Sequence, residues 1–219
     1  TNYIVVSDKV DYTREFFRLL GIGSKVVSIR NRGIYIEEAI ARYRYPNKDK
    51  SYVEHKELNA ISHLFDKFKK KYSNYPEKIF IERKSSSNGS MKRRIEPTEI
   101  THEIAKEKGY QIVYLEDIKL LEKINLFFNA KKIVGVHGAG LGNIIFCNKA
   151  CEVIEARNSL GMPNIFIELA KEIGIENYQI IEMKSYLNVK ESNQLKQMTG
   201  NNSNNVLPLM LDKEFIKRL

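Results

Sequence analysis

Three glycines follow a short apolar run near the middle of the 219-residue chain. Residues 133–136 read Ile-Val-Gly-Val, which is typical of a strand buried on both faces, and Gly138, Gly140 and Gly142 come directly after it. A strand that ends in glycines and opens into a helical turn exposes unpaired backbone N–H groups, and an anion can approach them closely. We therefore expect a phosphate-binding loop, with an unliganded tight turn as the alternative.

His137 stands between this strand and the glycines. An imidazole at that point can donate a hydrogen bond to a phosphate or to a leaving oxygen, and it changes its charge near neutral pH. A histidine at a sheet edge also often serves only as a structural partner of a carbonyl group. Both roles stay open at the level of sequence.

Alternating strands and helices would position this loop. We expect strands at residues 3–7, 25–29, 78–81, 111–115, 133–136, 152–156 and 178–183, and helices at residues 13–20, 54–72, 96–108, 118–129 and 165–173. Such alternation predicts an α/β protein with Rossmann-like parallel sheets and flanking helices. The asparagine-rich residues 188–205 predict a loop or a disordered segment, and residues 206–219 predict an apolar run followed by a short basic helix.

Polar side chains recur where the expected strands after Pro76 end. They are Arg83, Glu116, Asp117, His137, Glu155 and Arg157. Ligands of open α/β sheets bind outside the carboxyl ends of the strands. One ligand could therefore contact this whole group of side chains.

The composition restricts the partners. A formal net charge of +9 favours anionic partners, such as nucleotide phosphates or an anionic membrane surface. No basic stripe interleaved with aromatic residues and no zinc-finger spacing is present, so we expect no nucleic acid. No apolar stretch approaches the roughly 20 residues of a membrane helix, and no signal peptide is evident, which predicts a cytoplasmic protein that could associate with a membrane surface. Two cysteines without a histidine cluster predict no metal site.

Several segments, in this order along the chain, resemble the glycosyltransferase family 61 domain. They are Ile-Phe-Ile-Glu-Arg at residues 79–83, Arg-Arg-Ile-Glu-Pro-Thr-Glu at 93–99, Tyr-Leu-Glu at 114–116, Val-Gly-Val-His-Gly-Ala-Gly-Leu-Gly-Asn at 134–143, and Val-Ile-Glu at 153–155. The resemblance covers roughly residues 3–183. It implies a GT-B-like fold, in which a nucleotide sugar lies between two Rossmann-like halves, and an inverting, metal-independent glycosyltransferase of EC class 2.4.

The resemblance also implies a division of the chain and a set of partners. Residues 1–75 would form a partial N-terminal Rossmann-like half, residues 76–185 the nucleotide-sugar-binding half, and residues 186–219 a polar loop and a helix that packs back on the fold. The donor would be a nucleotide sugar, with a UDP sugar as one candidate. The acceptor would be a glycan, a lipid-linked group or a protein, and no cofactor is implied.

Site residues follow from the same resemblance. The family's signature loop, which usually has threonine where this chain has Gly142, is matched by His137, Gly138, Ala139, Gly140, Leu141 and Asn143.

Charged donor ligands complete the implied site. Arg83 and Arg93 match the family's paired arginines, and Arg94 is an equal candidate on chemistry alone. Bidentate arginines and fixed backbone donors stabilise the charge that develops on a leaving phosphate, although surface arginines often form only ordinary ion pairs. Glu155 matches a position that often binds ribose hydroxyls in transferases of this architecture, because a carboxylate accepts from two hydroxyls.

Glycosyl transfer also needs a general base that deprotonates the acceptor hydroxyl, and none of the matched segments supplies one. Family members usually carry it near an Asn-x-x-His-Trp segment, which has no counterpart here, since the sequence contains no tryptophan. Asp8 and Asp11, near the end of the first expected strand, are our candidates. A non-catalytic nucleotide- or glycan-binding module, or one part of a larger transferase, is the competing interpretation. A nucleotide-dependent oxidoreductase is disfavoured, because the spacing around Gly138 is not the dinucleotide fingerprint.

Overall fold

The computed structural model describes residues 4–6, 11–23, 26–28, 61–84, 94–158, 162–199 and 207–219. In chain order its elements are β1 (Ile4–Val6), α1 (Asp11–Leu19), β2 (Val26–Ser28), η2 (Asp66–Phe68), β3 (Lys78–Glu82), β4 (Ile95–Glu96), α3 (Thr98–Glu107), β5 (Gln111–Tyr114), η3 (Leu115–Asp117), α4 (Leu120–Asn129), β6 (Lys132–Val136), η4 (Ala139–Phe146), β7 (Glu152–Asn158), α5 (Ile165–Ile173), β8 (Tyr178–Met183), α6 (Val189–Thr199), β9 (Leu209–Met210) and α7 (Lys213–Arg218), where η marks a 3-10 helix.

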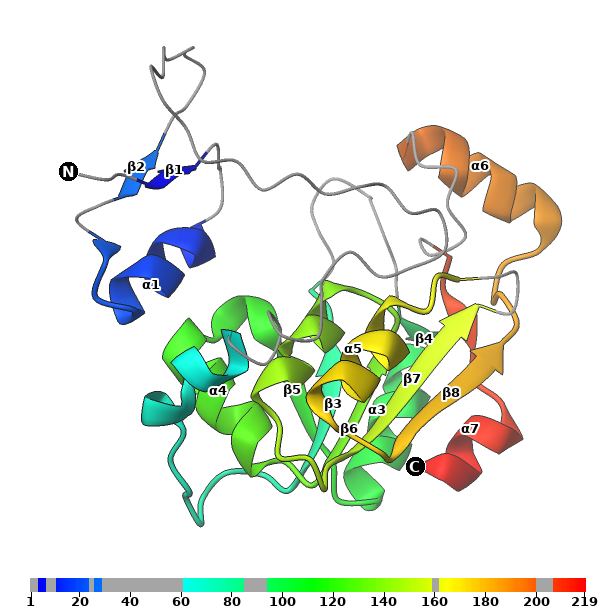
Figure 1. The fold of residues 1–219 in the computed structure, drawn as a ribbon. Helices are drawn as coiled ribbons and strands as arrows, with labels where there is room; N and C mark the ends of the chain where they lie inside the picture. Colours follow the sequence, from blue (N-terminus) through cyan, green and yellow to red (C-terminus); the bar gives the residue numbers. More distant parts are fainter. Residues whose placement is uncertain are drawn as a thin grey trace.

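A five-stranded sheet with the order β5-β3-β6-β7-β8 forms the centre of the structure, and every neighbouring pair in it is parallel (Figure 1). Helices flank the sheet. This arrangement confirms the predicted α/β class with a Rossmann-like parallel sheet. The division into halves at residues 1–75 and 76–185 stays a prediction.

Both faces of the sheet are buried, and the strand register decides which side chain enters which core. Ile79, Ile133 and Val153 belong to the core that α4, η4 and α5 cover. Phe80 and Val134, one position further along their strands, enter the opposite core, to which α3 and α7 contribute. Continuous β-branched and aromatic runs are therefore required, since successive side chains point to opposite faces.

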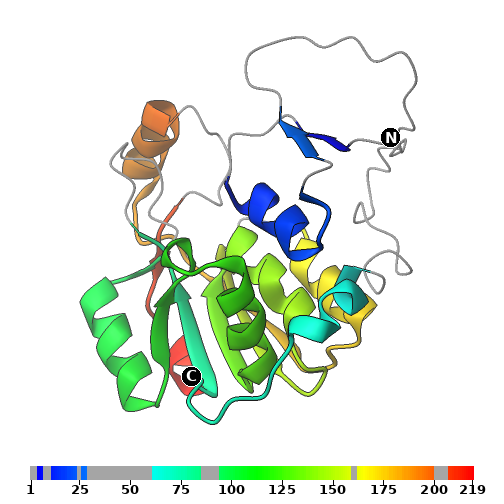
Figure 2. The same cartoon turned by 90° about the vertical axis from the view of Figure 1, so that its left-hand side faces the viewer.

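The N-terminal elements lie on the carboxyl-end side of this sheet (Figures 1 and 2). β1 and β2 pair with each other in a separate parallel two-stranded sheet. α1 contacts α4, and the carboxylate of Glu15 accepts a hydrogen bond of 2.9 Å from the backbone N–H of Leu120. This bond satisfies one of the free donors at the start of α4 and ties the N-terminal part of the chain to the sheet domain.

Helix α6 shows that the prediction of a loop over residues 188–205 is wrong for residues 189–199, while residues 200–205 lie outside the described part of the chain. Asn188 and Glu191 bond each other's backbone reciprocally: Glu191 N–H donates to Asn188 Oδ1, and Asn188 N–H donates to Glu191 Oε2, both at 3.0 Å. This is a capping box, which satisfies two donors that a helix start otherwise leaves unpaired. The asparagine-rich composition concealed this start signal.

The helix expected over residues 54–72 is also wrong at its C-terminal end. Helical residues 61–64 pass through a turn into η2, and residues 69–72 are not helical. Residues 54–60 lie outside the described part of the chain. The carboxylate of Asp66 connects the two sides of this turn, since it bonds His63 Nδ1 at 2.8 Å and Lys69 Nζ at 2.7 Å.

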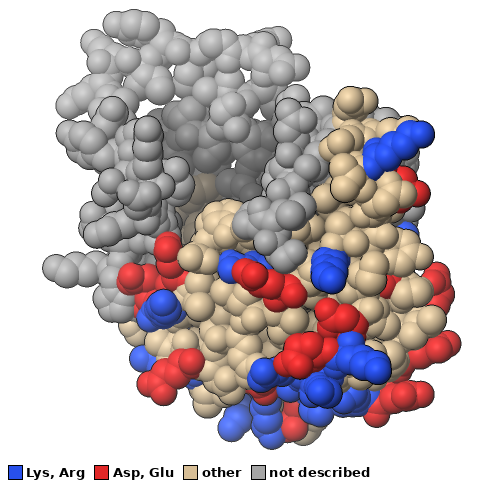
Figure 3. All heavy atoms as spheres, turned by 90° about the vertical axis from the view of Figure 1, so that its right-hand side faces the viewer, with Lys and Arg blue, Asp and Glu red and all other residues tan. Residues whose placement is uncertain are grey.

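The positive charge is mixed with negative charge on the face shown in Figure 3. Lys and Arg gather at the lower end of this face, and Asp and Glu lie among them. Arg218 pairs with Glu214 at 2.9 Å, and Lys132 pairs with Glu152 at 3.4 Å. No helix within the described residues is long and apolar enough to cross a membrane.

Substitution of Phe65 measures how much the packing of the segment before β3 contributes to stability. The Phe65 side chain is fully buried. The centroid of its ring lies 5.2 Å from the ring centroid of Phe16 and 5.3 Å from that of Phe146. We expect Phe65→Ala to lower the free energy of unfolding by about 3–5 kcal/mol, because the truncation leaves a cavity beside the rings of Phe16 and Phe146. Urea denaturation measures the change.

Leu64→Ala is the matched control, since Leu64 is 50% exposed. It should change the free energy of unfolding by less than about 1 kcal/mol. Equal losses in the two variants would contradict the packing described for Phe65.

Candidate functional site

The sheet reverses its direction of growth between β3 and β6. From β3 the chain adds β5 on one side and then β6, β7 and β8 on the other. Such a switch point opens a crevice at the carboxyl ends of the two central strands, and it is where ligands of doubly wound sheets bind. A cavity of about 860 Å³ lies here, lined by Glu82 and Arg83 after β3 and by Ala139, Gly140, Gly142 and Asn143 after β6.

Close packing shapes the glycine loop. A Cβ atom on Gly140 would lie 3.2 Å from Ile81 Cγ2 and 3.3 Å from Leu115 Cδ1, whereas Gly142 has open space around it. Asn143 Nδ2 donates to the carbonyl of Gly140 at 2.9 Å and closes the loop. The backbone at Gly140 therefore lies directly against the sheet, and the side of the loop at Gly142 faces outward.

Apolar side chains anchor the 3-10 helix that follows. Leu141, Ile144 and Phe146 of η4 are buried, and Leu141 packs close to Gly135 of β6. Leu141 therefore contributes to the core, although the resemblance placed it in the signature loop. The loop is held from beneath, so its backbone donors need little reorganisation to bind an anion.

His137 lies in a hydrogen-bonded chain beneath the loop. Nδ1 of its imidazole makes a short hydrogen bond with Glu155 Oε1, and the hydroxyl of Tyr178 donates to Glu155 Oε2 at 2.6 Å. The ring packs edge-on against Phe166 of α5 at 5.0 Å. Nδ1 thus faces the carboxylate, and no residue that the structure describes bonds Nε2.

Glu155 occupies a different place from the one the resemblance suggested. The residue is 1% exposed, it does not line the cavity, and both of its oxygens accept bonds from protein side chains. Burial, followed by the charge and hydrogen bond of Glu155, raises the pKa of Tyr178 well above its ordinary value. The Tyr178 hydroxyl therefore stays protonated as the donor to Glu155. Ribose binding by Glu155 stays a prediction.

Cationic and acidic side chains share the rest of the cavity wall. Arg83 lies at its edge with Lys119 and Lys123, which are one turn apart at the start of α4. Glu116 and Asp117 of η3 also line it, and Asp117 pairs with Lys84 at 2.6 Å. The structure thus brings Arg83, Glu116 and Asp117 together, as the strand-end pattern predicted.

A second buried carboxylate, that of Glu82, borders the cavity, and we did not predict it from the sequence as a site residue. Its Oε2 lies 2.8 Å from Nε2 of His102 on α3, and its Oε1 accepts the backbone N–H of Arg83 at 2.8 Å. The second bond fixes the point at which the chain leaves β3 and presents Arg83. Twenty residues separate Glu82 from His102, so no local pattern could have signalled the pair.

The remaining candidates are not at the cavity or are not described. Arg94 precedes β4, where its Nε donates to Glu96 Oε1 at 2.5 Å, and it does not line the cavity. Asp8 and Arg93 lie outside the described residues. Asp11 begins α1, but its side chain is not described. No group of three His, Cys, Asp or Glu side chains among the described residues could hold a metal ion.

Comparison with known protein families assigns the class. The family model Glycosyltransferase 61 matches residues 4–154, which is more than half of the chain and includes the whole cavity wall described above. The chain belongs to glycosyltransferase family 61, and its domain is one for glycosyl transfer. A search of curated proteins gives no match to the chain.

Two glycine substitutions test the geometry of the loop. We expect Gly140→Val to lower the free energy of unfolding by about 1–3 kcal/mol, because its side chain would press into Ile81 and Leu115. Gly142→Thr restores the family's usual residue in open space and should change stability by less than about 0.5 kcal/mol. Chemical denaturation of both variants measures this. A destabilised Gly142→Thr protein with an unaffected Gly140→Val protein would contradict the arrangement.

Glu96 makes a pH-dependent contribution to stability. Burial acts to raise its pKa, but hydrogen bonds from Thr98 and Arg94 outweigh burial and hold the pKa below the ordinary value of 4.5. A carboxyl group with a lowered folded-state pKa stabilises the protein above its unfolded pKa, and this contribution disappears as the pH falls through the folded pKa. The stability difference between wild type and Glu96→Gln should therefore be full at neutral pH and shrink below pH 4.5.

Unfolding curves across the acid range check this expectation. Glu99→Gln serves as the control, because Glu99 is an acidic residue in the first turn of α3, the helix that follows Glu96. A stability difference for Glu96→Gln that does not vary with pH would refute the role of the Arg94–Glu96 pair.

Proposed function

We propose that this domain transfers a sugar from a nucleotide-sugar donor bound at the β3–β6 switch point. The observation that carries the proposal is the cavity itself, in which the glycine loop of a family 61 glycosyltransferase faces Arg83 across the crevice where doubly wound sheets hold nucleotides. The donor's diphosphate would lie over the backbone of residues 138–142. Arg83, with Lys119 and Lys123, would balance its charge.

The chemistry of transfer explains why these groups are needed. The acceptor oxygen forms a bond to the anomeric carbon, and the bond from that carbon to the phosphate oxygen breaks, so negative charge develops on the leaving nucleotide. Fixed backbone N–H groups and a guanidinium stabilise this charge more in the transition state than in the bound donor. An inverting, metal-independent route follows from the resemblance, and the cationic groups would take the place of a divalent ion.

His137 is buried and does not itself line the cavity, so in this proposal its Nε2 would reach the leaving group from beneath the loop. The bond to Glu155 determines which nitrogen faces the carboxylate, and Tyr178 holds the carboxylate in turn. In this proposal Glu155 and Tyr178 are positioning residues that act through the orientation of the imidazole, and ribose binding by Glu155 remains a separate prediction. The acceptor's proton requires a separate base, for which Asp8 and Asp11 remain our candidates.

Nucleotide binding tests the donor site. Calorimetry with a panel of nucleoside diphosphates and their sugars should show binding by wild type and roughly 10- to 100-fold weaker binding by Arg83→Ala, because a charge-assisted hydrogen bond is lost. Arg218→Ala on α7 is the control, since its guanidinium pairs at the surface with Glu214. Folded wild-type protein that binds none of the panel would refute the proposal.

Turnover tests the role of the histidine chain. Release of nucleoside diphosphate should fall at least about 100-fold in His137→Gln and by a smaller factor in Tyr178→Phe, with nucleotide affinity changed only a few-fold. Circular dichroism confirms that each variant folds. Nucleotide binding without turnover by wild type, in the presence of a broad acceptor mixture, would instead favour the non-catalytic binding module.

A further inference from the structure

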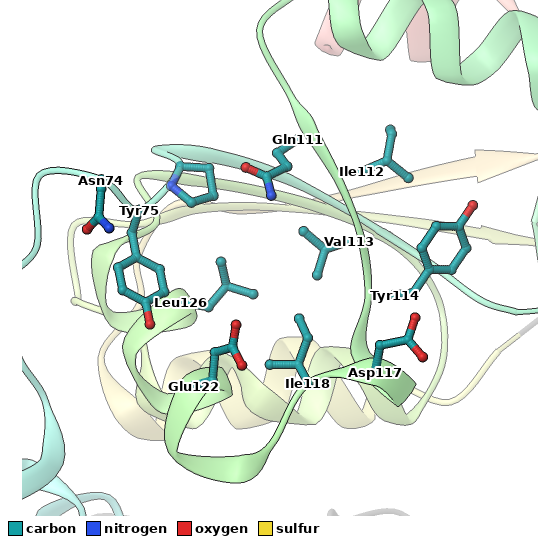
Figure 4. A pocket seen from close by; sticks show the side chains of 11 residues that line it. Asn74, Tyr75, Gln111, Ile112, Val113, Tyr114, Asp117, Ile118, Glu122 and Leu126 are labelled. Atoms are coloured by element: carbon teal, nitrogen blue, oxygen red, sulfur yellow. The ribbon is translucent and has the colours of Figure 1, made fainter.

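A second hollow runs along the outer edge of the sheet. It has a volume of about 430 Å³ and lies between β5, α4 and the segment that leads into β3 (Figure 4). Its volume is within the range of small-ligand sites, roughly 300–1,000 Å³. β5 forms one wall over its four residues, about 13 Å of strand.

The wall opposite β5 is fixed by two side chains of α4. Asn125 Oδ1 accepts the backbone N–H of Lys70 at 2.8 Å, and Asn129 Oδ1 accepts that of Tyr72 at 2.9 Å. Asn129 Nδ2 also donates to the carbonyl of Lys70 at 2.8 Å. This clamp holds the backbone just before Tyr75, so the hollow has a preformed wall on that side.

The lining combines an apolar floor with polar groups that face each other. In Figure 4, Gln111 and Glu122 point toward one another across the hollow, with Val113 and Leu126 between them. Tyr75 closes one end. Tyr75 and Glu122 both line the hollow, and burial and then the charge of the nearby Glu122 raise the pKa of Tyr75.

These groups suit a sugar. A pyranose presents an apolar C–H face that packs on an aromatic ring or an aliphatic floor, and its hydroxyls donate to carboxylates and exchange hydrogen bonds with amides. Tyr75 has a second ring beside it, since Tyr72 lies 5.4 Å away and is 43% exposed. An aromatic wall of this kind extends the contact surface beyond the hollow.

The charge of the lining distinguishes between classes of glycan. Asp117 and Glu122 line the hollow and no Lys or Arg does, in a chain with a net charge of +9. Asp117 is paired with Lys84 at 2.6 Å, so Glu122 is the carboxylate of the lining that would repel an anionic sugar or a phosphate and tolerate a neutral one. The donor cavity differs in that Arg83, Lys119 and Lys123 line it beside the carboxylates of Glu15, Glu82, Glu116 and Asp117.

The two cavities adjoin each other. Asp117 and Ile118 line both of them and form a common wall, so a chain that passes over this wall could reach both. We propose that the β5–α4 hollow binds a neutral glycan, the part of the acceptor chain that precedes the unit receiving the new sugar. This assignment of an acceptor rests on the transfer function proposed above.

An extended peptide is the competing occupant. β5 is an edge strand, and a peptide could add to it by main-chain hydrogen bonds. The facing amide and carboxylate and the tyrosine wall favour the glycan, because strand addition depends on the backbone of β5 and does not require Gln111 or Glu122.

Glycan binding without donor tests the site. Wild-type protein is screened on an array of short neutral oligosaccharides, each with a uronic acid counterpart, and hits are titrated by calorimetry. The double variant Gln111→Ala with Glu122→Gln should bind roughly tenfold more weakly or worse, through the loss of hydrogen bonds. Both side chains are exposed, so folding should be preserved. Tyr75→Phe should bind like wild type and Tyr75→Ala should not.

The matched control replaces the same residue types at the opposite edge of the sheet. Gln179→Ala with Glu214→Gln alters another hollow of about 440 Å³, beside β8 and α7. It should leave glycan affinity unchanged.

Three results with oligosaccharides would overturn the inference. They are no neutral oligosaccharide bound by folded wild type, tighter binding of the uronic acid counterparts, and affinity that survives the double variant. Capture of an extended peptide that competes at β5 would also overturn it. Nucleotide binding is measured in the same samples. Intact nucleotide binding without glycan binding refutes only this subsite, whereas glycan binding without nucleotide binding supports the glycan site and refutes the donor proposal.

Discussion

The close approach of the glycine loop to β3 is the constraint on which the rest of the site depends. Gly135 faces Ile81 across the β3–β6 ladder, and Gly140 lies against the same isoleucine and against Leu115. Side chains at these two glycines would push the loop away from the sheet. This contact between backbone and side chain therefore sets how closely the loop approaches the end of β3, where Arg83 follows the strand.

Two buried carboxylates stabilise the strand ends on either side of that contact. Glu155 faces the core under α5, where His137 and Tyr178 bond it, and Glu82 faces the core under α3, where His102 bonds it. A buried carboxylate is costly unless its oxygens have partners. Each one therefore fixes the elements that carry its partners, and Glu82 also fixes the backbone N–H of Arg83. The site is consequently held from both faces of the sheet.

The β5–α4 hollow adjoins the cavity at the switch point, because Asp117 and Ile118 line both. Arg83, Lys119 and Lys123 line the cavity beside several carboxylates, whereas no Lys or Arg lines the hollow. This difference in lining is the reason for proposing an anionic donor in the cavity and a neutral glycan in the hollow.

The sequence by itself determined the α/β class, most of the strands after Pro76, the glycine loop and its family, because apolar periodicity, glycine spacing and a local motif are properties of neighbouring residues. It also contained the capping box of α6, a local signal that composition concealed. Only the tertiary structure decided that Glu155 lies beneath His137, that Glu82 meets His102, and that Arg94 pairs with Glu96 away from the cavity. A side chain's partner across a sheet or from a crossing helix depends on register and packing, and no pattern along the chain encodes it.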